Sequence, residues 1–423
     1  MKKNVWIFNH YAADTYFDNG GRHYWFAKYL KTNGYSPTVF VANSIHGASG
    51  EKTHYFSNDG LYSLHNQANI DVPYVFVSAR GYSGNGRSRI LNMLDYFFNV
   101  IKTAKSLYKK NKTKPDIIIA SSVHPLTLLA GLRLGKYFKI PCVCEVRDLW
   151  PESIVAYSSK WKKKNLIIRI LYFAEKHIYK SCDALIFTME GGYKYIEDQG
   201  WTSLVKKEKV YCLNNGIDLE EYRVSISEFG SSAHNRELNK EFFNVIYTGS
   251  IRAVNDIGYF LDVAKALTNK NIIINIFGNG DEREVLERRL HDEGIENVRF
   301  QGVVPKLEIP AILSNGDLLV FHLKPSTVQK YGLSLNKMFE YLASEKPILI
   351  DCAAEYNPIV KWRAGISIEG ATPEVFASEI DKFSNMESEE YNEYCENARK
   401  AAEHYDFKEL TNRLIDIIEN TNI

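Results

Sequence analysis

Long apolar runs are missing from this sequence of 423 residues. Its most apolar stretches, such as residues 166–174, are short and are broken by a charge at Arg169, so they are too short to form a membrane-spanning helix. Nothing at the start has the pattern of a secretory signal. We therefore expect a cytoplasmic protein, which leaves open whether it also attaches to a membrane surface.

Cysteine is also scarce, with six residues scattered along the chain. The only close pair, Cys142 and Cys144, alternates along an apolar segment typical of a strand, and the two further ligands that a zinc site needs are not offered nearby. These observations argue against a metal site at this pair.

The net charge of +1 hides an asymmetry between the two halves. Residues 1–210 carry 30 Lys and Arg against 16 Asp and Glu, whereas residues 211–423 carry 22 against 35. A basic half indicates an anionic partner, either a nucleic acid, an anionic membrane or a phosphorylated lipid. Because zinc-finger spacing and ribonucleoprotein motifs are both missing, we expect no nucleic acid and favour the membrane surface.

Short β-branched runs alternate with longer amphipathic segments, which is the pattern of parallel sheets covered by helices. The length favours two domains. We predict an α/β protein of two doubly wound, Rossmann-like domains facing a cleft. The expected parts are a first domain at residues 1–217, a polar linker at 218–241, a second domain at 242–404 and a terminal helix at 405–423 that could pack back on the first domain.

The strands predicted from these runs fall into two sets. In the first half they are Val5–Asn9, Thr38–Ala42, Tyr74–Ser78, Asp116–Ala120, Pro141–Val146, Ala184–Thr188 and Val210–Leu213. In the second half they are Asn244–Thr248, Ile272–Phe277, Val298–Gln301, Asp317–Phe321, Pro347–Asp351 and Gly365–Ile368. Open parallel sheets bind ligands at the carboxyl ends of their strands, so the residues that follow each run are candidate site residues.

Two such places stand out in the first half. His10 follows the first strand, and Gly20 and Gly21 precede a helix, where exposed backbone N–H groups can approach a phosphate or a sugar; a plain tight turn is the alternative. The fifth strand runs into Arg147 and Asp148. Asp148 could orient or deprotonate an acceptor hydroxyl, or it could merely cap the next helix and pair with Arg147.

The second half offers glycine turns after two successive strands, at Gly249 and Gly278, with Arg252 close to the first. Glycines allow the backbone to approach a diphosphate closely, and Arg252 supplies positive charge. Ordinary turn chemistry is the alternative for each turn taken singly.

The segment from Gly332 to Ala343 carries the most information. Apolar residues at i, i+3, i+4 and i+7 predict a helix that exposes Lys337 and Glu340 on another side. We expect the helix to begin at Gly332–Ser334, with free N–H groups at Gly332, Leu333 and Ser334 for a diphosphate and with Lys324 nearby. Glu340 would then lie about 9 Å further along, within reach of a ribose. A solvated polar face is the alternative.

Taken together, these motifs resemble the family-4 retaining glycosyltransferases of the bacterial polysaccharide and O-antigen branch, which includes N-acetylfucosaminyl transferase-like enzymes. The resemblance covers nearly the whole chain. It is carried by Gly20-Gly21-Arg22, the segment 147–152, Asn214 to Asp218, Tyr247-Thr248-Gly249, residues 277–280 and Phe339 to Ala343.

This resemblance implies a glycosyltransferase B-type fold, a nucleoside diphosphate sugar donor, usually with uridine, transfer with retention, and neither metal nor cofactor. Glu340 matches the second glutamate of the family's paired-glutamate motif, which holds the ribose. The first glutamate falls on Gly332, and a frequent lysine falls on Asn255, which leaves Arg252 with Lys324 or Lys337 to neutralise the diphosphate.

We therefore expect Asp148, Arg252 and Glu340 to carry the reaction. The expected donor contacts are Gly20, Gly21, Gly249, Arg252, Gly278, Lys324, Gly332, Leu333, Ser334, Lys337 and Glu340. The expected acceptor side consists of His10, Arg22, Arg147 and Asp148.

Basic, amphipathic segments at 87–114 and 159–174 indicate a peripheral protein on the inner face of the cell membrane that acts on a lipid-linked glycan. Core-facing helices with solvated backs are the alternative. For the function as a whole, a sugar-nucleotide 2-epimerase and a non-catalytic donor-binding partner subunit are the rival hypotheses, whereas a nicotinamide dehydrogenase is disfavoured because no contiguous dinucleotide fingerprint follows a strand.

Overall fold

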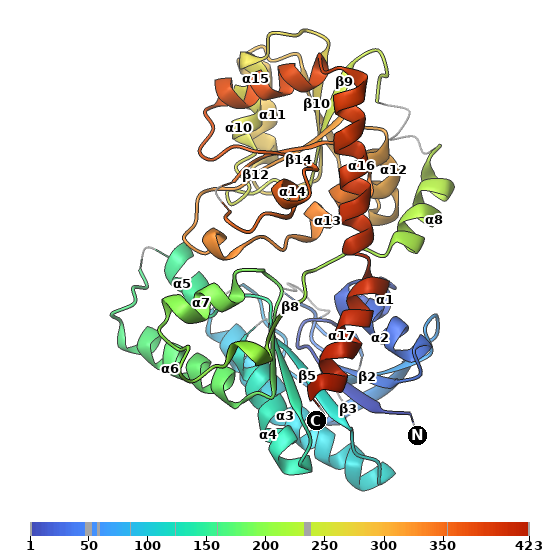
Figure 1. The fold of residues 1–423 in the computed structure, drawn as a ribbon, viewed down its shortest axis with the longest axis vertical. Coiled ribbons are helices and arrows are strands. Elements are labelled where there is room, and N and C mark those ends of the chain that lie inside the picture. Colours follow the sequence, from blue (N-terminus) through green and yellow to red (C-terminus); the bar gives the residue numbers. More distant parts are fainter. Residues whose placement is uncertain are drawn as a thin grey trace. The chain divides into compact units, whose positions relative to one another are not determined.

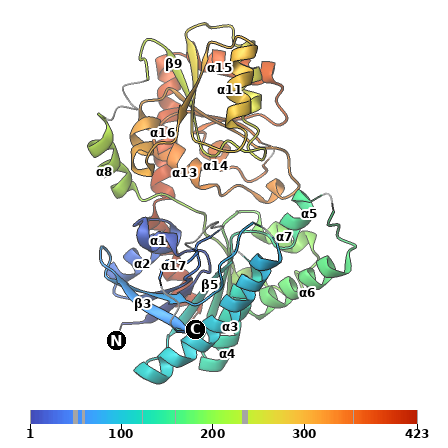
Figure 2. The same cartoon turned by 180° about the vertical axis from the view of Figure 1, so that it is seen from behind.

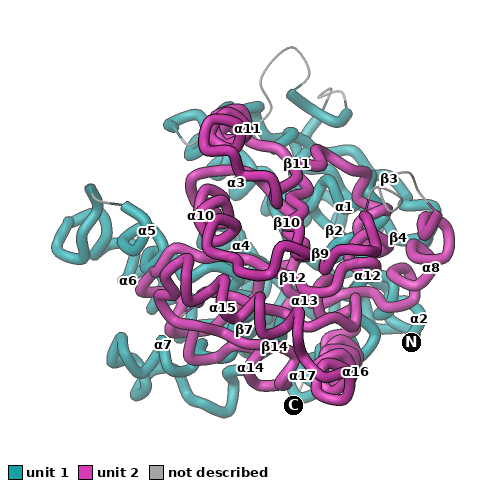
Figure 3. Tube along the Cα trace, turned by 90° about the horizontal axis from the view of Figure 1, so that it is seen from above, with its two compact units in different colours: residues 1–214, 407–423 teal, residues 215–406 magenta. Residues whose placement is uncertain are grey.

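A computed structural model of the chain describes residues 2–46, 53–56, 60–84, 86–122, 124–158, 160–231, 238–352 and 354–421. The chain forms two compact units (Figure 3). Unit 1 consists of Met1–Asn214 with Phe407–Ile423, and unit 2 consists of Asn215–Asp406.

Unit 1 contains an eight-stranded sheet in the order β3-β4-β2-β1-β5-β6-β7-β8, in which only the β3–β4 pair is antiparallel (Figure 1). Its strands are β1 Asn4–Phe8, β2 Ser36–Ala42, β3 Tyr62–Gln67, β4 Val72–Val77, β5 Ile117–Ser122, β6 Cys142–Val146, β7 Ala184–Phe187 and β8 Val210–Cys212. Its helices are α1 Asp14–Phe17, α2 Arg22–Thr32, α3 Arg87–Asn111, α4 Pro125–Phe138, α5 Glu152–Tyr157, α6 Leu166–Ser181, α7 Gly192–Asp198 and α17 Phe407–Thr421.

Alternate residues of β1 show how the two faces of this sheet are covered. Val5 and Ile7 belong to the core that includes α2 and α17, where Phe26 meets Phe407 edge to face at 5.5 Å. Trp6 points the other way, to Phe138 of α4, at 5.8 Å. Helix α4 packs against both α3 and α6 on that second face (Figure 2).

Unit 2 contains a six-stranded parallel sheet in the order β11-β10-β9-β12-β13-β14. Its strands are β9 Phe243–Thr248, β10 Ile272–Phe277, β11 Val298–Gly302, β12 Leu318–His322, β13 Ile348–Asp351 and β14 Gly365–Ser367. Its α-helices are α8 Leu219–Phe229, α10 Gly258–Ala266, α11 Arg283–Asp292, α12 Ile309–Ser314, α13 Asn336–Ala343, α14 Pro358–Lys361, α15 Pro373–Ser384 and α16 Ser388–His404.

Each strand expected from the sequence lies within one or two residues of an observed strand. One observed strand, β3, was not predicted, because its residues are mostly polar and do not form the apolar run that indicates a strand. Thr372 caps α15, since its hydroxyl accepts from the Val375 N–H at 3.4 Å.

The segment expected to be a linker, 218–241, differs from the structure at residues 218–231, while its residues 232–237 lie outside the described residues. It contains α8, whose buried Leu219 and Tyr222 join the core of unit 2. Asp218 caps this helix by accepting from the Glu221 N–H at 2.9 Å. The boundary between the units lies between Asn214 and Asn215 instead.

Among the residues described, no helix combines the length and the apolar character needed to cross a lipid bilayer.

Candidate functional site

Helix α13 is held against the carboxyl edge of the unit 2 sheet by Tyr341. The Tyr341 hydroxyl accepts from the Thr248 N–H at 2.9 Å, at the end of β9, and donates to the Val320 carbonyl of β12 at 3.4 Å. Tyr341 is fully buried. Because Lys337 lies one helical turn before Tyr341, this anchor fixes Lys337 beside the turn that follows β9.

The side chain of Lys337 contacts that turn closely. Its Nζ donates to the Tyr247 hydroxyl at 3.2 Å and lies 4.3 Å from the centre of the Tyr247 ring. A Cβ placed on Gly249 would come within 2.7 Å of the same Nζ, and Gly249 has φ 147°. The positive φ therefore favours glycine here, and the ammonium group lies close against its backbone.

Burial lowers the pKa of Lys337 to about 8, against a smaller opposing effect of Glu340. A lysine whose charge is disfavoured by desolvation binds an anion well, because the anion restores the stability of the charged form. Lys337 and the Gly249 turn thus form a site suited to a phosphate group, and their contact with a donor stays a prediction.

Glu340 lies on the same side of α13 as Lys337, three residues further along. Burial raises the pKa of the Glu340 carboxyl, and Lys306 and Lys337 oppose that shift. The residue is neither fully exposed nor part of a solvated polar face. A part-buried carboxylate beside an ammonium group can accept hydrogen bonds from the hydroxyls of a ligand.

The start of α13 differs from the expectation. The helix begins at Asn336, so Glu340 lies about 6 Å along the helix from its first residue instead of 9 Å. The N–H groups of Gly332 and Leu333 are already used by the carbonyls of Gln329 at 2.9 Å and Tyr356 at 3.2 Å. These two residues therefore cannot offer free N–H groups to a diphosphate.

Ser334 is part of the connection that leads into α13. Its hydroxyl accepts from the Asn215 N–H at 3.0 Å, and its carbonyl accepts from the Asn215 side chain at 2.7 Å. These bonds fix the residues just before the helix. They give Ser334 a positioning role.

The glycine after β10 has a packing role. A Cβ on Gly278 would lie 1.8 Å from the Gly249 carbonyl oxygen, so only glycine lets the two turns pack together. The N–H of Gly249 bonds to the Phe277 carbonyl at 2.9 Å, and the N–H of Gly278 bonds to the Gly302 carbonyl at 2.7 Å. These turns approach each other closely, and a ligand contact from either N–H would have to replace one of those bonds.

Arg252 lies in the exposed turn after β9. Asn255, which stands where a lysine was expected, ties this turn together: its side-chain amide donates to the Ser250 carbonyl and hydroxyl, each at 2.8 Å, and its N–H donates to the Arg252 carbonyl at 2.8 Å. The turn is thus fixed at its base while the Arg252 side chain is exposed.

Lys324 follows β12 and lies 3.4 Å from a carboxylate oxygen of Asp256. His322, two residues earlier, is stacked on Tyr259 at 4.3 Å and lies 3.0 Å from a carboxylate oxygen of Asp351. Lys324 therefore belongs to a charged group at the same edge of the sheet, but its charge is shared with Asp256.

In unit 1, Arg22 was expected to face an acceptor. Its guanidinium instead forms a buried ion pair with Glu145. The Arg22 guanidinium donates to Glu145 of β6 at 2.6 and 2.8 Å and to the carbonyls of Leu213 and Asn214 at 2.9 and 2.6 Å. Glu145 also accepts from Ser121 at 2.6 Å and contacts His23 at 3.1 Å. Although burial by itself raises the pKa of Glu145, Arg22 and His23 hold it well below its usual range.

His10 is buried as well, with 1% of its surface exposed. Its Nδ1 lies 2.6 Å from Nε2 of His124, and its ring is stacked on Tyr96 at 4.4 Å. Burial, followed by His124, keeps the pKa of His10 well below its usual value. Arg22 and His10 therefore support the carboxyl edge of the sheet from beneath and do not present their polar atoms on its surface.

Arg147 and Asp148 follow β6 at this edge. The Arg147 N–H donates to the Ser122 hydroxyl at 3.2 Å, and Asp148 is exposed. Protein atoms nevertheless crowd the carboxyl, and this desolvation raises the pKa of Asp148 against the opposing charges of Arg147 and Arg89. The N-cap of α5 is Pro151, so the alternative that Asp148 caps that helix is wrong.

Gly21 is the N-cap of α2, with φ 94°, and a Cβ there would lie 3.0 Å from the Thr15 methyl group. Gly20 precedes it. The pair therefore starts the helix as expected, and the left-handed backbone explains the second glycine without a ligand.

Sequence reasoning missed three groups: Glu145, the pair of Tyr247 and Tyr341, and His124. A charge inside an otherwise apolar strand could have indicated Glu145. Both tyrosines lie within motifs that carry the resemblance, but nothing in the sequence indicated the roles of the tyrosines or of His124, because those roles depend on contacts between distant elements.

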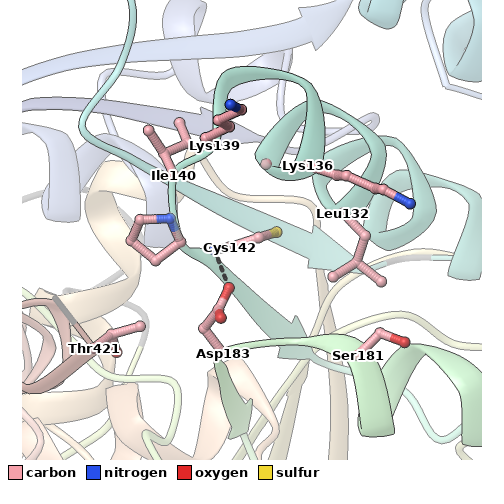
Figure 4. Close-up of a pocket in the computed structure, with 10 residues that line it drawn as sticks. Leu132, Lys136, Lys139, Ile140, Cys142, Ser181, Asp183 and Thr421 are labelled. Carbon is pink, nitrogen blue, oxygen red and sulfur yellow. Dashed lines mark hydrogen bonds between the residues drawn. The ribbon is translucent and has the colours of Figure 1, made fainter. Parts of the chain in front are cut away.

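A pocket of about 480 Å³ lies at the other end of the unit 1 strands (Figure 4). There Asp183 accepts from the Cys142 N–H at 2.8 Å, at the amino end of β6, with Lys136 and Lys139 at the rim. Ligands of such sheets bind at the carboxyl ends, so this pocket is not part of the candidate site. In the part of the chain that the structure describes, no group of three or more His, Cys, Asp or Glu side chains could hold a metal ion.

Two family models match the chain. Residues 24–221 match the family described as Glycosyltransferase Family 4, and residues 231–401 match the family described as Glycosyl transferases group 1. A Klebsiella pneumoniae protein, described as an uncharacterized 41.2 kDa protein in the cps region, is 27% identical over 183 residues, which are 43% of this chain and 45% of that protein. The match thus spans less than half the length of that relative.

Solved structures match over almost the whole chain. Anabaena HepE in complex with UDP has a TM-score of 0.66 at 14% identity, with 99% of this chain and 100% of that chain covered. The trehalose 6-phosphate synthase of Burkholderia multivorans has a TM-score of 0.71 at 13% identity, with 99% of each chain covered. WaaG, a glycosyltransferase involved in lipopolysaccharide biosynthesis, has a TM-score of 0.60 at 15% identity, with 98% and 99% covered. At these identities, the similarity establishes the fold.

Proposed function

Because the chain belongs to the glycosyltransferases of the B-type fold, with a family 4 half followed by a group 1 half, we propose that it transfers a sugar from a nucleoside diphosphate donor, most simply a UDP-sugar. The acceptor is a hydroxyl of a lipid-linked glycan in surface polysaccharide synthesis, and the sugar is a hexose or an N-acetylated amino sugar. The observation that carries the proposal is the position of Lys337 against the Gly249 turn, with Glu340 three residues along the same helix.

In this proposal the donor diphosphate binds at the Gly249 turn. Lys337 neutralises one phosphate from the helix side, and Arg252 reaches it from the exposed turn. Glu340 accepts hydrogen bonds from the ribose hydroxyls. The HepE structure, which contains UDP, supports a uridine donor for a chain of this fold, and the cps region of the Klebsiella relative supports a polysaccharide product.

The reaction breaks the bond between the anomeric carbon and the diphosphate oxygen and forms a bond to the acceptor oxygen. The electron pair of the broken bond leaves with the diphosphate, whose growing negative charge Lys337 and Arg252 stabilise. With retention, the acceptor approaches on the face that the diphosphate leaves, and a phosphate oxygen takes the proton of the acceptor hydroxyl. Asp148 then orients that hydroxyl and has no need to act as a strong base.

A thermal-shift screen of uridine, guanosine and thymidine diphosphates and their sugars identifies the donor, because a ligand that binds only the native state raises the unfolding temperature. The best donor is then incubated with and without a bacterial lipid-linked glycan, and the products are analysed by mass spectrometry and by NMR of the anomeric centre. Transfer with retention supports the proposal. A new sugar nucleotide from the donor alone indicates a 2-epimerase, and donor binding without any product indicates a non-catalytic donor-binding subunit.

Arg252→Ala tests the leaving-group role separately. Loss of a group that stabilises only the transition state lowers kcat by roughly 100-fold or more. A change of less than about twofold would remove Arg252 from the reaction.

A further inference from the structure

Helix α6 of unit 1 exposes a row of large apolar side chains. Leu166, Ile167, Ile170 and Phe173 are exposed by 71, 57, 57 and 73%. Their spacing places them on one side of the helix. The opposite side packs into the unit through Ile168, Glu175, Ile178 and Tyr179, so the exposed row is not a core face with a polar back.

The same kind of surface continues on the neighbouring helices. On α3, Ile90, Leu91 and Phe98 are exposed by 58, 41 and 53%, and on α4 Tyr137 is exposed by 48%. Since α4 packs between α3 and α6, these residues belong to one helical layer (Figure 2). We call the outer side of α3, α4 and α6, with the loop that carries Lys160 and Lys162–Lys164, the basic-apolar face.

Charge on this face is almost entirely positive. Helices α3, α4 and α6 contain eleven Lys and Arg residues but only two acidic residues, Asp95 and Glu175. Asp95 accepts from Arg80 at 2.6 Å. Glu175 is buried, accepts from Tyr179 and Tyr195 at 2.7 Å each, and has a pKa raised by burial to about 8. Neither acid offsets the exposed cations.

We propose that the basic-apolar face docks this protein on the surface of an anionic lipid bilayer. Aliphatic and aromatic side chains surrounded by lysines are the composition of helices that lie in a membrane interface, where the apolar side chains enter the acyl boundary and the cations meet anionic headgroups. The finding that no described helix can cross a bilayer fits a surface that lies on the membrane.

A second copy of the chain is a poorer occupant of this face. A two-fold dimer through it would place each set of lysines opposite its own copy, and like charges brought together across an interface weaken association. A single-stranded nucleic acid would be held by stacking aromatic rings, whereas the α6 row is mainly aliphatic.

Sedimentation with lipid vesicles tests the proposal, using the full chain and vesicles of phosphatidylcholine alone or with 30% phosphatidylglycerol. The apolar variant carries Leu166→Ser, Ile170→Ser and Phe173→Ser. The charge variant carries Lys160→Ser, Lys162→Ser and Lys164→Ser, which leaves the ion pair of Lys163 with the buried Glu152 intact. Two matched controls replace exposed residues of unit 2 with serine. The control for the apolar variant changes Val285, Val360 and Val375, and the control for the charge variant changes Lys240, Lys382 and Lys400.

We expect the unmodified chain to bind anionic vesicles at least tenfold more tightly than neutral ones. Each lysine near an anionic leaflet contributes roughly fivefold, so the charge variant loses on the order of 100-fold on anionic vesicles only. Each buried large apolar side chain contributes on the order of tenfold, so the apolar variant loses at least 100-fold on anionic vesicles. The controls bind as the unmodified chain does.

Equal binding to both vesicle types, or loss of binding in the controls to the same extent as in the variants, would overturn the proposal. So would self-association of the unmodified chain in sedimentation velocity that the apolar variant abolishes, because the face would then bind a second copy. UDP binding by the variants checks that unit 2 is intact. Vesicle binding requires no sugar transfer, so this test and the test of the proposed reaction can fail independently.

Discussion

The pKa of Lys337 leads to a quantitative prediction for donor binding. In the free protein this pKa is lowered by burial to about 8, whereas a diphosphate beside the ammonium group returns it to at least its ordinary value of about 10.4. Above pH 8 the free protein therefore loses a proton that the complex keeps, and binding must take that proton up. The dissociation constant of UDP should rise by about 20-fold between pH 7.5 and 9.5, and about 0.9 proton should be taken up per UDP at pH 9.

Isothermal titration calorimetry measures both quantities, with the proton uptake taken from buffers of different ionisation enthalpy. The phosphates of UDP are ionised above pH 7.5, so they add no further dependence in this range. Lys337→Met should bind UDP about 10 to 100 times more weakly at pH 7.5, because a charge-assisted hydrogen bond is lost, and its affinity should not change with pH. Lys337→Arg keeps its charge and should also show a flat profile.

A flat profile for the unmodified chain, or the same decline in Lys337→Met, would refute the assignment of Lys337 to the phosphate site. The apo protein supplies an independent check. The surroundings of Lys337 disfavour its charged form, so Lys337→Met should stabilise the free protein by about 1 to 2 kcal/mol. This value is smaller than the pKa shift alone would imply, because Lys337 is only part-buried. The unfolding transition should rise by about 2 to 6 °C.

The remaining predictions concern residues with contrasting roles. Glu340→Ala should weaken UDP binding by about 10 to 100-fold with the fold intact, whereas Asn336→Ala, exposed on the same helix, should leave the dissociation constant unchanged; equal effects would place the ribose elsewhere. Gly278→Ala should lower the free energy of unfolding by more than about 3 kcal/mol. Gly294→Ala is the control and should cost far less, because Gly294 also has a positive φ but has open space around it. Similar melting temperatures of the two variants would contradict the packing role of Gly278. Glu145→Gln breaks a buried ion pair and should lower the free energy of unfolding of unit 1 by about 3 to 5 kcal/mol. UDP binding below the melting transition should be unchanged. A melting curve like that of the unmodified chain would contradict this structural role of Glu145.

The strands were predictable because each carries its own signal. A parallel strand buried on both faces is a short apolar run, and each run that was predicted to be a strand overlaps a strand in the structure. β3 lies at the edge of the sheet, where its residues Leu64 and Asn66 are exposed, and it lacks the continuous apolar run that indicated the other strands. Helix α8 was missed for a related reason, since only three of its residues are buried.

The two glycine turns of unit 2 show where sequence reasoning reached its limit. Gly249 and Gly278 follow successive strands and look alike in the sequence. In the structure Gly249 makes room for an ammonium group from another helix, and Gly278 makes room for the backbone of Gly249. Which glycine faces a ligand depends on the position of α13, and that position is set by Tyr341 and Asn215, which no local pattern relates to the turns.

Whether a buried charge serves the fold or a ligand can be judged by how completely the protein satisfies it. Glu145 has Arg22, His23 and Ser121 as partners, and its charged form is strongly favoured, so its charge is accounted for within unit 1. Among the residues that the structure describes, Lys337 has one hydrogen-bond partner, a tyrosine hydroxyl, with a part-buried carboxylate nearby, and its charged form is disfavoured. A folded chain retains such an unfavourable cation where binding an anion offsets its cost, because stability is given up where function needs it. By this criterion Arg22 belongs to the framework of unit 1, and Lys337 is the residue of unit 2 on which donor binding should depend most.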